Sequence, residues 1–353
     1  MSTGGFTESE SIAGSSPTIT PSQDEVVAPR RRPGRLQLLG IVEQYGLLAV
    51  LVALVVAFSL ALPSTFPTGF TFRTLLENQS VVALVSLAVM VPLITGQFDL
   101  SVGYMITLTN VLVVGLQVNT HLPWAVAVLV ALAVGALVGI VNGFLVTVVG
   151  INAFIATLGT GTFLYGLAEW YTGGSQIAGN ISQRFVSLAH TVGPIPAPAI
   201  YVIAVAVILW LFTEHMPRGR LFYVTGANLR AAELVGIRTR RVIWIAFVAS
   251  AVLACIAGLV LSSELAVGNS EIGPEYLLQA YAAAFLGATS IRPGRFNVWG
   301  TIVAVLILAV AVEGLQQLGA SFYVESLFDG GILVIAVALS VFAARRAQTE
   351  GAG

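Results

Sequence analysis

The sequence contains no lysine, and charged residues of any kind are scarce. All sixteen basic residues are arginines, and charged side chains occupy 9% of the 353 positions. A soluble domain carries about 25% charged residues. A Walker A loop needs its lysine to hold phosphates, and a Schiff base needs a lysine amine. The absence of lysine therefore excludes both kinds of site and argues against an enzyme.

Cysteine and histidine are also rare. The one cysteine, Cys255, lies inside an apolar run, and the three histidines (His121, His190 and His215) are far apart in the sequence. Neither a disulfide framework nor a cysteine–histidine metal site has this pattern. The net charge of −1 gives no basic balance for nucleic acid. We expect no cofactor, metal or nucleic acid on this chain.

Long hydrophobic runs are what the sequence does have. Hydrophobic residues make up 57% of the chain, and the mean hydropathy is +0.91. A membrane-spanning helix needs about 20 mostly apolar residues. That rule predicts ten helices, at residues 42–62, 74–95, 101–118, 123–149, 152–172, 198–214, 242–262, 275–291, 297–318 and 323–344. The predicted fold class is all-α, a polytopic helical membrane protein with about ten transmembrane helices.

The arginines predict an orientation for these helices. Connections on the cytoplasmic side of a membrane protein are enriched in arginine and lysine. In the ten-helix arrangement the N-terminal tail, the 215–241 loop, residues 292–296 and the C-terminus all share one side, and each contains arginines. Only Arg73 and Arg184 fall on the other side. Both termini are therefore predicted to be cytoplasmic.

Three parts of the chain are expected from this pattern. Residues 1–38 are rich in serine, threonine, glycine and proline, which predicts a disordered cytoplasmic tail. Its arginine cluster also fits the n-region of a signal peptide, but no small-residue cleavage site follows the apolar run. Residues 39–345 form the transmembrane domain, and residues 346–353 form a cytoplasmic C-terminal tail.

Two pairs of segments indicate a weak internal repeat. The motif GQFDLSVG at 96–103 resembles GRFNVWGT at 294–301, which aligns Asp99 with Asn297. The segment 150–164 can likewise be aligned with 319–333. Paired repeats are common in transporters, whose sites lie where the repeats meet.

Asp99 is a carboxylate between two apolar runs, and three interpretations stay open. It can cap the N-terminus of the following helix, accepting from amides near Val102 and Gly103. It can line a translocation path with its neighbour Ser101, or it can be an ion-coupling carboxylate. The flanking glycines, and the neutral Asn297 at the aligned position, favour the cap.

The loop at 215–242 is the longest polar break between apolar runs, yet its sequence predicts structure. Asn228 is a suitable N-cap for a short helix that contains Glu233, and Gly236 is a natural C-terminal stop. A capped helix surrounded by arginines is suited to docking another protein. The alternative is an ordinary arginine-rich loop with an interfacial helix.

A family resemblance follows from five motifs. TGQFDLSVG, VNGFLV, GINAFIATLGTGTF, GRLFYVTGANLRAAELVGIRTRRV and FDGGILVIAVAL occur in an order that resembles the ribose-type sugar permeases of bacterial ABC importers. The resemblance covers about residues 40–345. One segment departs from it: residues 286–301 read LGATSIRPGRFNVWGT where the family has a run rich in paired glycines.

The resemblance implies a transport subunit without its own ATPase site. It implies ABC ATPase subunits that carry ATP and Mg, a periplasmic or lipid-anchored solute-binding protein, a second permease copy and the lipid of the bacterial inner membrane as partners. It also implies that the 215–241 loop couples to the ATPase, through residues Gly226, Asn228, Ala231, Glu233, Gly236, Ile237 and Arg240.

Other residues are candidates for the translocation path. Phe154 and Thr157 offer an aromatic face and a hydroxyl, which suit a sugar, and Asn297 is grouped with Asp99 and Ser101 as either path or structural break. The solute is not determined by the sequence. Two rival functions remain at this point: an ion-coupled secondary transporter that uses Asp99, and a membrane docking protein that transports nothing.

Overall fold

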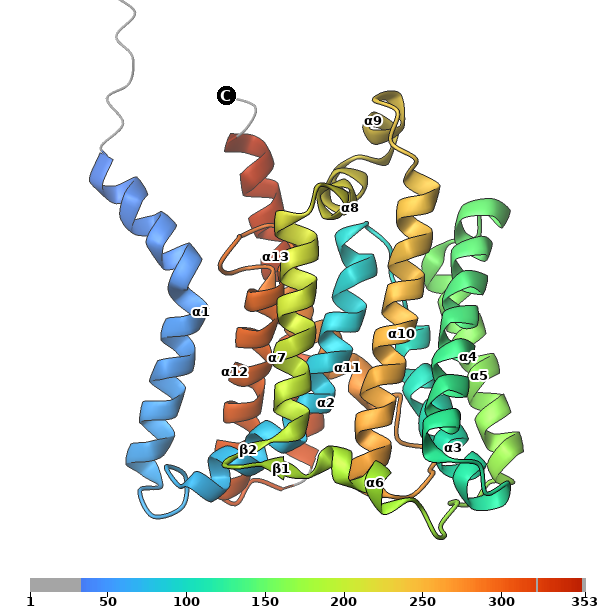
Figure 1. The fold of residues 1–353 in the computed structure, drawn as a ribbon. Coiled ribbons are helices and arrows are strands. Elements are labelled where there is room, and N and C mark those ends of the chain that lie inside the picture. The colour runs from blue at the N-terminus through green and yellow to red at the C-terminus, as the bar shows by residue number, and fades with distance from the viewer. Residues whose placement is uncertain (1–32, 322, 351–353) are drawn as a thin grey trace, which may run out of the picture.

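The computed structural model describes residues 33–321 and 323–350, and helices dominate it (Figure 1). Each of the ten predicted segments is helical. The long helices are α1 (Pro33–Ala61), α2 (Gly69–Ile94), α3 (Ser101–Asn119), α4 (Trp124–Phe144), α5 (Ala153–Thr172), α7 (Ala197–Trp210), α10 (Thr239–Leu265), α11 (Glu275–Gly287), α12 (Val298–Gln317) and α13 (Tyr323–Glu350).

Shorter elements occupy the connections. They are α6 (Gln183–Val186), a 3₁₀ turn (Ser187–Ala189), the small hairpin of β1 (Thr191–Val192) and β2 (Ile195–Pro196), α8 (Pro217–Ala227) and α9 (Leu229–Leu234). Single π-helical turns extend α4 over Leu145–Val149 and α7 over Leu211–His215. The turns carry α4 to the end predicted for its segment and α7 one residue beyond it.

Six of the described helices are long and apolar enough to cross a membrane. They are Gly69–Ile94, Ser101–Asn119, Trp124–Val149, Ala197–His215, Thr239–Leu265 and Val298–Gln317. A shorter apolar stretch, Tyr45–Ala61, lies in α1. The prediction of a helical membrane protein is therefore confirmed.

The expected tails lie at the edges of the described residues. Residues 1–32 of the predicted N-terminal tail lie outside them, and residues 33–38 are the first residues of α1. At the other end, α13 continues through residues 346–350 of the predicted C-terminal tail.

The centre of the molecule is a close contact between helices. Helix α10 packs against α2, α3 and α4. Gly139 of α4 lies so near α10 that an added Cβ would be 2.5 Å from the Cα of Val248, and a Cβ on Gly135 would meet the Sγ of Cys255. The GALVG motif at 135–139 thus serves internal packing, as small residues do between membrane helices.

The packing has an internal symmetry. Helix α3 packs on α5 as α11 packs on α13, and α10 packs on α3 and α4 as α2 packs on α11 and α12. The set α2–α5 therefore corresponds to the set α10–α13, with α2 and α10 in contact and running in opposite directions (Figure 1). Such inverted repeats are typical of transporters.

Only one of the two sequence matches agrees with this symmetry. The match of 150–164 with 319–333 agrees with it, because those segments lead into the corresponding helices α5 and α13, and Gly150 and Gly319 both have positive φ. The match of Asp99 with Asn297 does not, because it pairs the starts of α3 and α12, which are not corresponding helices. That second similarity is one of local structure.

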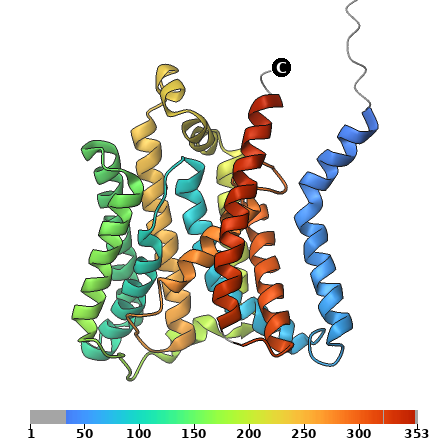
Figure 2. The same ribbon diagram turned by 180° about the vertical axis from the view of Figure 1, so that it is seen from behind.

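The two ends of the helix bundle differ in charge. The N-terminal end of α1 and the C-terminal end of α13 lie on the same face as α8 and α9 (Figures 1 and 2). Helix α6 and the hairpin lie on the opposite face. The first face carries six arginines between residues 218 and 241, from α8 to the start of α10, and Arg184 of α6 lies on the other. We call the α8–α9 face the inner face and the other the outer face.

Candidate functional site

The inner face is built around two short helices that we call the elbow, α8 and α9 (Pro217–Leu234). The elbow connects the π-helical end of α7 to the start of α10 and lies beyond the long helices (Figure 1). It is the loop that the sequence predicted to be structured.

The predicted cap and stop of α9 are confirmed. The side chain of Asn228 accepts a hydrogen bond from the amide of Ala231 at 3.0 Å, which is the contact of an N-cap residue. Gly236 has a φ of +84°, the left-handed conformation that glycine adopts most easily after a helix. The amide of Ile237 then bonds to the carbonyl of Ala232 at 3.0 Å.

Two contacts fix α9 against α10. Ala232 is buried, so one face of this short helix is held by packing. On the same helix, the carboxylate of Glu233 accepts from the hydroxyl of Thr239 at 2.8 Å, across the turn into α10. Glu233 therefore stabilises the elbow through its bond to the start of α10. Arg240 lies exposed on the first turn of α10.

The exposed tip of the elbow is apolar. Leu234 is 88% exposed and Val235 is 74% exposed, and Leu229 is exposed on the same short helix. Arginines 230, 238 and 240 surround this tip and are exposed as well. We did not predict a role for Leu234 and Val235. The sequence feature that could have indicated this role is a pair of adjacent apolar residues in an otherwise polar loop.

Gly226 allows α8 to pack closely against the end of α2. A Cβ at this position would lie 2.0 Å from the carbonyl oxygen of Ile94, and a Cβ on Gly96 would lie 3.7 Å from the backbone of Gly226. No residue except glycine permits so close an approach of two backbones. The elbow is thereby fixed to the segment between α2 and α3, residues 95–100, which we call the first break.

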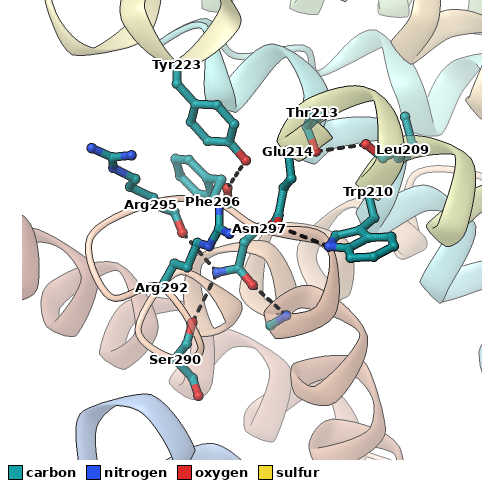
Figure 3. Close-up of polar contacts among 11 residues, drawn as sticks. Leu209, Trp210, Thr213, Glu214, Tyr223, Ser290, Arg292, Arg295, Phe296 and Asn297 are labelled. Atoms are coloured by element: carbon teal, nitrogen blue, oxygen red, sulfur yellow. Dashed lines mark hydrogen bonds and ion pairs between the residues drawn. The ribbon is translucent and has the colours of Figure 1, made fainter. Parts of the chain in front are cut away.

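A second set of contacts joins the elbow to residues 288–297, the segment between α11 and α12 that we call the second break. The hydroxyl of Tyr223 donates to the carbonyl of Phe296 at 3.0 Å (Figure 3). Burial, and then the negative charge of Glu214, raise the pKa of Tyr223. The phenol therefore keeps its proton, so this bond persists above neutral pH.

An ion pair supports the same connection. The carboxylate of Glu214, 8% exposed, lies 2.9 Å from the guanidinium of Arg292 and accepts from the indole of Trp210 at 3.0 Å (Figure 3). A cavity of about 670 Å³ lies between α8, the end of α2 and the second break, lined in part by Arg220 and Arg295. The elbow is thus attached to both breaks around an open space.

Asp99 occupies the first break and is fully buried. Its Oδ1 accepts from the amide of Ser101 at 3.1 Å and from the Ser101 hydroxyl at 2.5 Å. The N-cap position of α3 is Leu100, and no side chain caps it, so the predicted N-cap at Asp99 is wrong. Asp99 bonds Ser101, the first residue of α3, and not amides near Val102 and Gly103 as expected. Its own amide donates to the hydroxyl of Tyr281 at 3.0 Å.

Ser101 extends this contact to other helices. Its hydroxyl accepts from the amide of Asn142 at 2.9 Å, and the Asn142 oxygen accepts from the hydroxyl of Thr160 at 2.7 Å. Side chains from α4, α5 and α11 therefore meet at the start of α3.

Asn297 occupies the second break and is also buried. Its side-chain oxygen accepts from the amide of Gly300 at 2.7 Å, which caps α12. Its Nδ2 donates to the carbonyls of Ser290 and Arg295, both at 3.1 Å (Figure 3). It also lies 3.2 Å from the carbonyl of Gly287. These bonds fold the break back onto the end of α11.

The two predicted path residues on α5 lie in different surroundings. Thr157 is fully buried, and its hydroxyl accepts from the amide of Leu100 at 3.0 Å, so it supports the first break. Phe154 is 49% exposed on α5. The structure thus brings Asp99, Ser101 and Thr157 together, and leaves Phe154 and Asn297 apart from them.

The family of the chain follows from its relatives. The sequence profile of the permease component of branched-chain amino acid transport systems matches residues 71–337. The chain belongs to this permease family. No solved structure matches it.

Individual relatives align over nearly their whole length. The permease is 34% identical to the ribose import permease of Bacillus subtilis over 308 residues, which are 86% of this chain and 95% of the relative. It is 31% identical to the ribose import permease of Escherichia coli K12 (84% and 93% covered) and 30% identical to the D-allose transport permease of the same strain (84% and 91%). The resemblance inferred from the sequence motifs is confirmed.

Family membership has two general consequences. Permeases of ABC import systems are typically non-catalytic and work with ATPase and solute-binding subunits. It also places the elbow and the two breaks in a transport subunit. The contacts described above can therefore be read as parts of a transport device.

Proposed function

We propose that the permease imports a small sugar-like solute across the bacterial inner membrane by alternating access, driven by a separate ATPase. The relatives named for ribose and allose import support a polyhydroxylated solute. The observation that carries the proposal is the elbow, because it is exposed at its tip and attached at its base to both helix breaks.

The topology that we propose has all ten long helices in the membrane and the inner face toward the cytoplasm. The arginines of the elbow support this orientation, since cytoplasmic connections are arginine-rich. Both termini are then cytoplasmic, and the outer face receives the solute-binding protein. A second permease copy completes the transporter.

The coupling step that we propose begins at the tip of the elbow. Leu234 and Val235 insert into an apolar groove of the ATPase, and the surrounding arginines contact acidic groups at its rim. When the ATPase subunits close, α8 moves with them. Gly226 passes the motion to the first break, and Tyr223 passes it to the second.

In this mechanism the chain itself does no chemistry. ATP and Mg are held by the partner ATPase, and the permease has no lysine with which to form a Walker A site. We expect the purified permease to hydrolyse no ATP. The buried, hydrogen-bonded Asp99 serves the fold at the start of α3 and not ion coupling.

A charge at the tip of the elbow tests the proposal. In proteoliposomes with the ATPase and the solute-binding protein, Leu234→Asp should abolish solute-stimulated ATP hydrolysis and uptake together. The matched control is Leu318→Asp, which alters a 55% exposed leucine at the outer end of α12. Normal ATPase association by Leu234→Asp, in protein whose thermal unfolding is unchanged, would contradict the docking role.

A further inference from the structure

A polar cavity lies in the outer half of the molecule, and its lining includes none of the residues discussed above. It has a volume of about 520 Å³ and lies between α2, α11, α12 and α13, at the end opposite the elbow. Sites for small molecules span about 300–1,000 Å³. We call it the outer cavity; its polar lining comprises Asn78, Gln79, Glu275, Tyr276, Gln279, Glu313, Gln316, Glu325, Ser326 and Asp329.

Hydrogen bonds across the outer cavity hold its wall in place. The amide nitrogen of Gln279 on α11 donates to Glu325 at 3.2 Å and to Asp329 at 2.7 Å, both on α13. Gln316 on α12 donates to the other oxygen of Glu325 at 3.1 Å. Three helices are thus joined through side chains that also border the cavity, which is how a preorganised binding site is built.

One acceptor in this wall has no partner. Asp329 is only 6% exposed, and its Oδ1 accepts no hydrogen bond from the described residues. A buried polar atom without a partner destabilises the fold, and a charged one does so more strongly. A fold retains such an atom readily where a ligand supplies the missing donor.

The rest of the lining sets the chemistry of that ligand. The outer cavity is lined by four carboxylates and by no arginine or histidine, so acceptors outnumber donors and an anion would be repelled. Among the described residues no group of three acidic, histidine or cysteine side chains is placed to hold a metal ion. Hydroxyl groups fit best, because they donate to carboxylates and accept from the amides of Asn78 and Gln79. Tyr276 adds an aromatic ring to the wall.

We propose that the outer cavity is a binding station for a neutral, polyhydroxylated solute, in which a solute hydroxyl donates to the free oxygen of Asp329. The station lies within one subunit, on the side from which the solute arrives. This inference rests on the proposed function, because it assumes that the permease transports such a solute.

The near-isosteric change Asp329→Asn tests the station. Gln279 needs an oxygen at the position it now bonds, so the asparagine must present its NH₂ to the cavity. At the atom that faces the cavity, a hydrogen-bond acceptor is thus replaced by a donor, while the shape of the side chain stays the same. In nanodiscs containing the permease alone, we expect saturable binding of D-ribose or D-allose by saturation-transfer NMR, and affinity at least tenfold weaker in Asp329→Asn.

The controls separate this inference from the proposed function. Glu271→Gln removes a charge from an exposed outer acid that does not line the cavity, and should leave sugar binding unchanged. Ser326→Ala makes a smaller change in the wall and should weaken binding modestly, which guards against misfolding of the first variant. Leu234→Asp should leave binding intact while abolishing coupled uptake.

Three results would overturn the station. They are unchanged sugar affinity in folded Asp329→Asn, no saturable binding of either sugar by the unaltered permease, and binding of tetramethylammonium in preference to both sugars, which would make it a cation site. If uptake of sugar persists in Asp329→Asn with unaltered kinetics, the station fails while the proposed function stands. If no sugar is taken up by the complete transporter, the proposed function itself fails.

Discussion

The first and second breaks have nearly the same local structure. Each contains a glycine of positive φ, Gly96 at +77° and Gly294 at +80°. Three residues after this glycine, and directly after a phenylalanine, each has a buried polar residue close to the start of a helix. The elbow contacts both, through Gly226 on the first and Tyr223 on the second.

The two breaks differ in the hydrogen-bond partners of their polar residues, Asp99 and Asn297. Asp99 bonds Ser101, and through it a chain of side chains on α4 and α5. Asn297 bonds backbone groups, three carbonyls and one amide, all between Gly287 and Gly300. Asp99 is therefore linked to side chains of other helices, whereas Asn297 bonds only the backbone around its own break.

This difference shows why an acid stands in one break and an amide in the other. At position 99 the neighbours supply donors, so an acceptor is needed. At position 297 the neighbours are mostly carbonyls, so a donor is needed as well as an acceptor. The residues are similar in shape, and hydrogen-bond polarity distinguishes them.

The largest effect is expected at Asp99. Asp99→Leu removes the acceptor for both donors of Ser101 and leaves buried polar groups unpaired, at about 1–3 kcal/mol each. We expect a fall in the thermal unfolding temperature in detergent and a low yield of folded protein. Asp99→Asn keeps an acceptor at Oδ1 and should be mild. Equal stability of the two variants would show that the bonds between Asp99 and Ser101 contribute nothing.

The reverse exchange should be more harmful than Asp99→Asn. In Asn297→Asp a carboxylate replaces the Nδ2 that faces three carbonyls, so the donor is lost and oxygen faces oxygen. We expect a loss of about 2–3 kcal/mol in unfolding free energy. Denaturation curves of the two exchange variants, measured side by side, test the assigned polarity. Comparable losses in both would remove the distinction between the breaks.

A smaller effect on stability, but a large one on coupling, is expected at Gly226. Gly226→Ala places a methyl group against the carbonyl of Ile94, and overpacking of this kind costs about 1–3 kcal/mol. Uptake should fall more than the stability of the fold. Gly166→Ala is the matched control, because a Cβ there meets nothing within 4 Å. If both alanine variants transport alike, α8 does not act through the first break.

The smallest effect is expected at Tyr223. Tyr223→Phe removes one hydrogen bond to the second break and keeps the ring, a loss of about 1 kcal/mol. We expect a modest reduction in the ATP hydrolysis that solute stimulates, with little change in unfolding temperature. A reduction as large as that of Gly226→Ala would mean that the second break, and not the first, carries most of the motion.

Much of the elbow could be predicted from the sequence. Asn228, Glu233 and Gly236 lie within nine residues, and capping depends on contacts across a few residues of chain. The role of Gly226 could not be predicted in the same way. Its contact is with Ile94, on a helix more than a hundred residues earlier, and glycine in a polar loop has many uses.

The outer cavity was missed for a related reason. Glu275 and Glu313 stand near helix ends, where an acid is normally solvated, and nothing in the sequence indicates that four helices bring their polar side chains to one cavity. The internal repeat shows the same limit. The stronger-looking match, at Asp99 and Asn297, is a similarity of local turns, and only the packing identifies the corresponding helices.

The sequence by itself determined that this chain is a helical membrane protein, and its motifs indicated the permease family and the approximate positions of its helices. Hydrophobic run length, arginine placement and caps are local properties, so they can be read in order along the chain. The tertiary structure decided which groups meet. The amide of Asp99 bonds a tyrosine 182 residues away, and the Asp329 carboxylate bonds a glutamine 50 residues away. Such pairs form because packing apolar helices together also brings their few polar groups into contact, where each needs a partner.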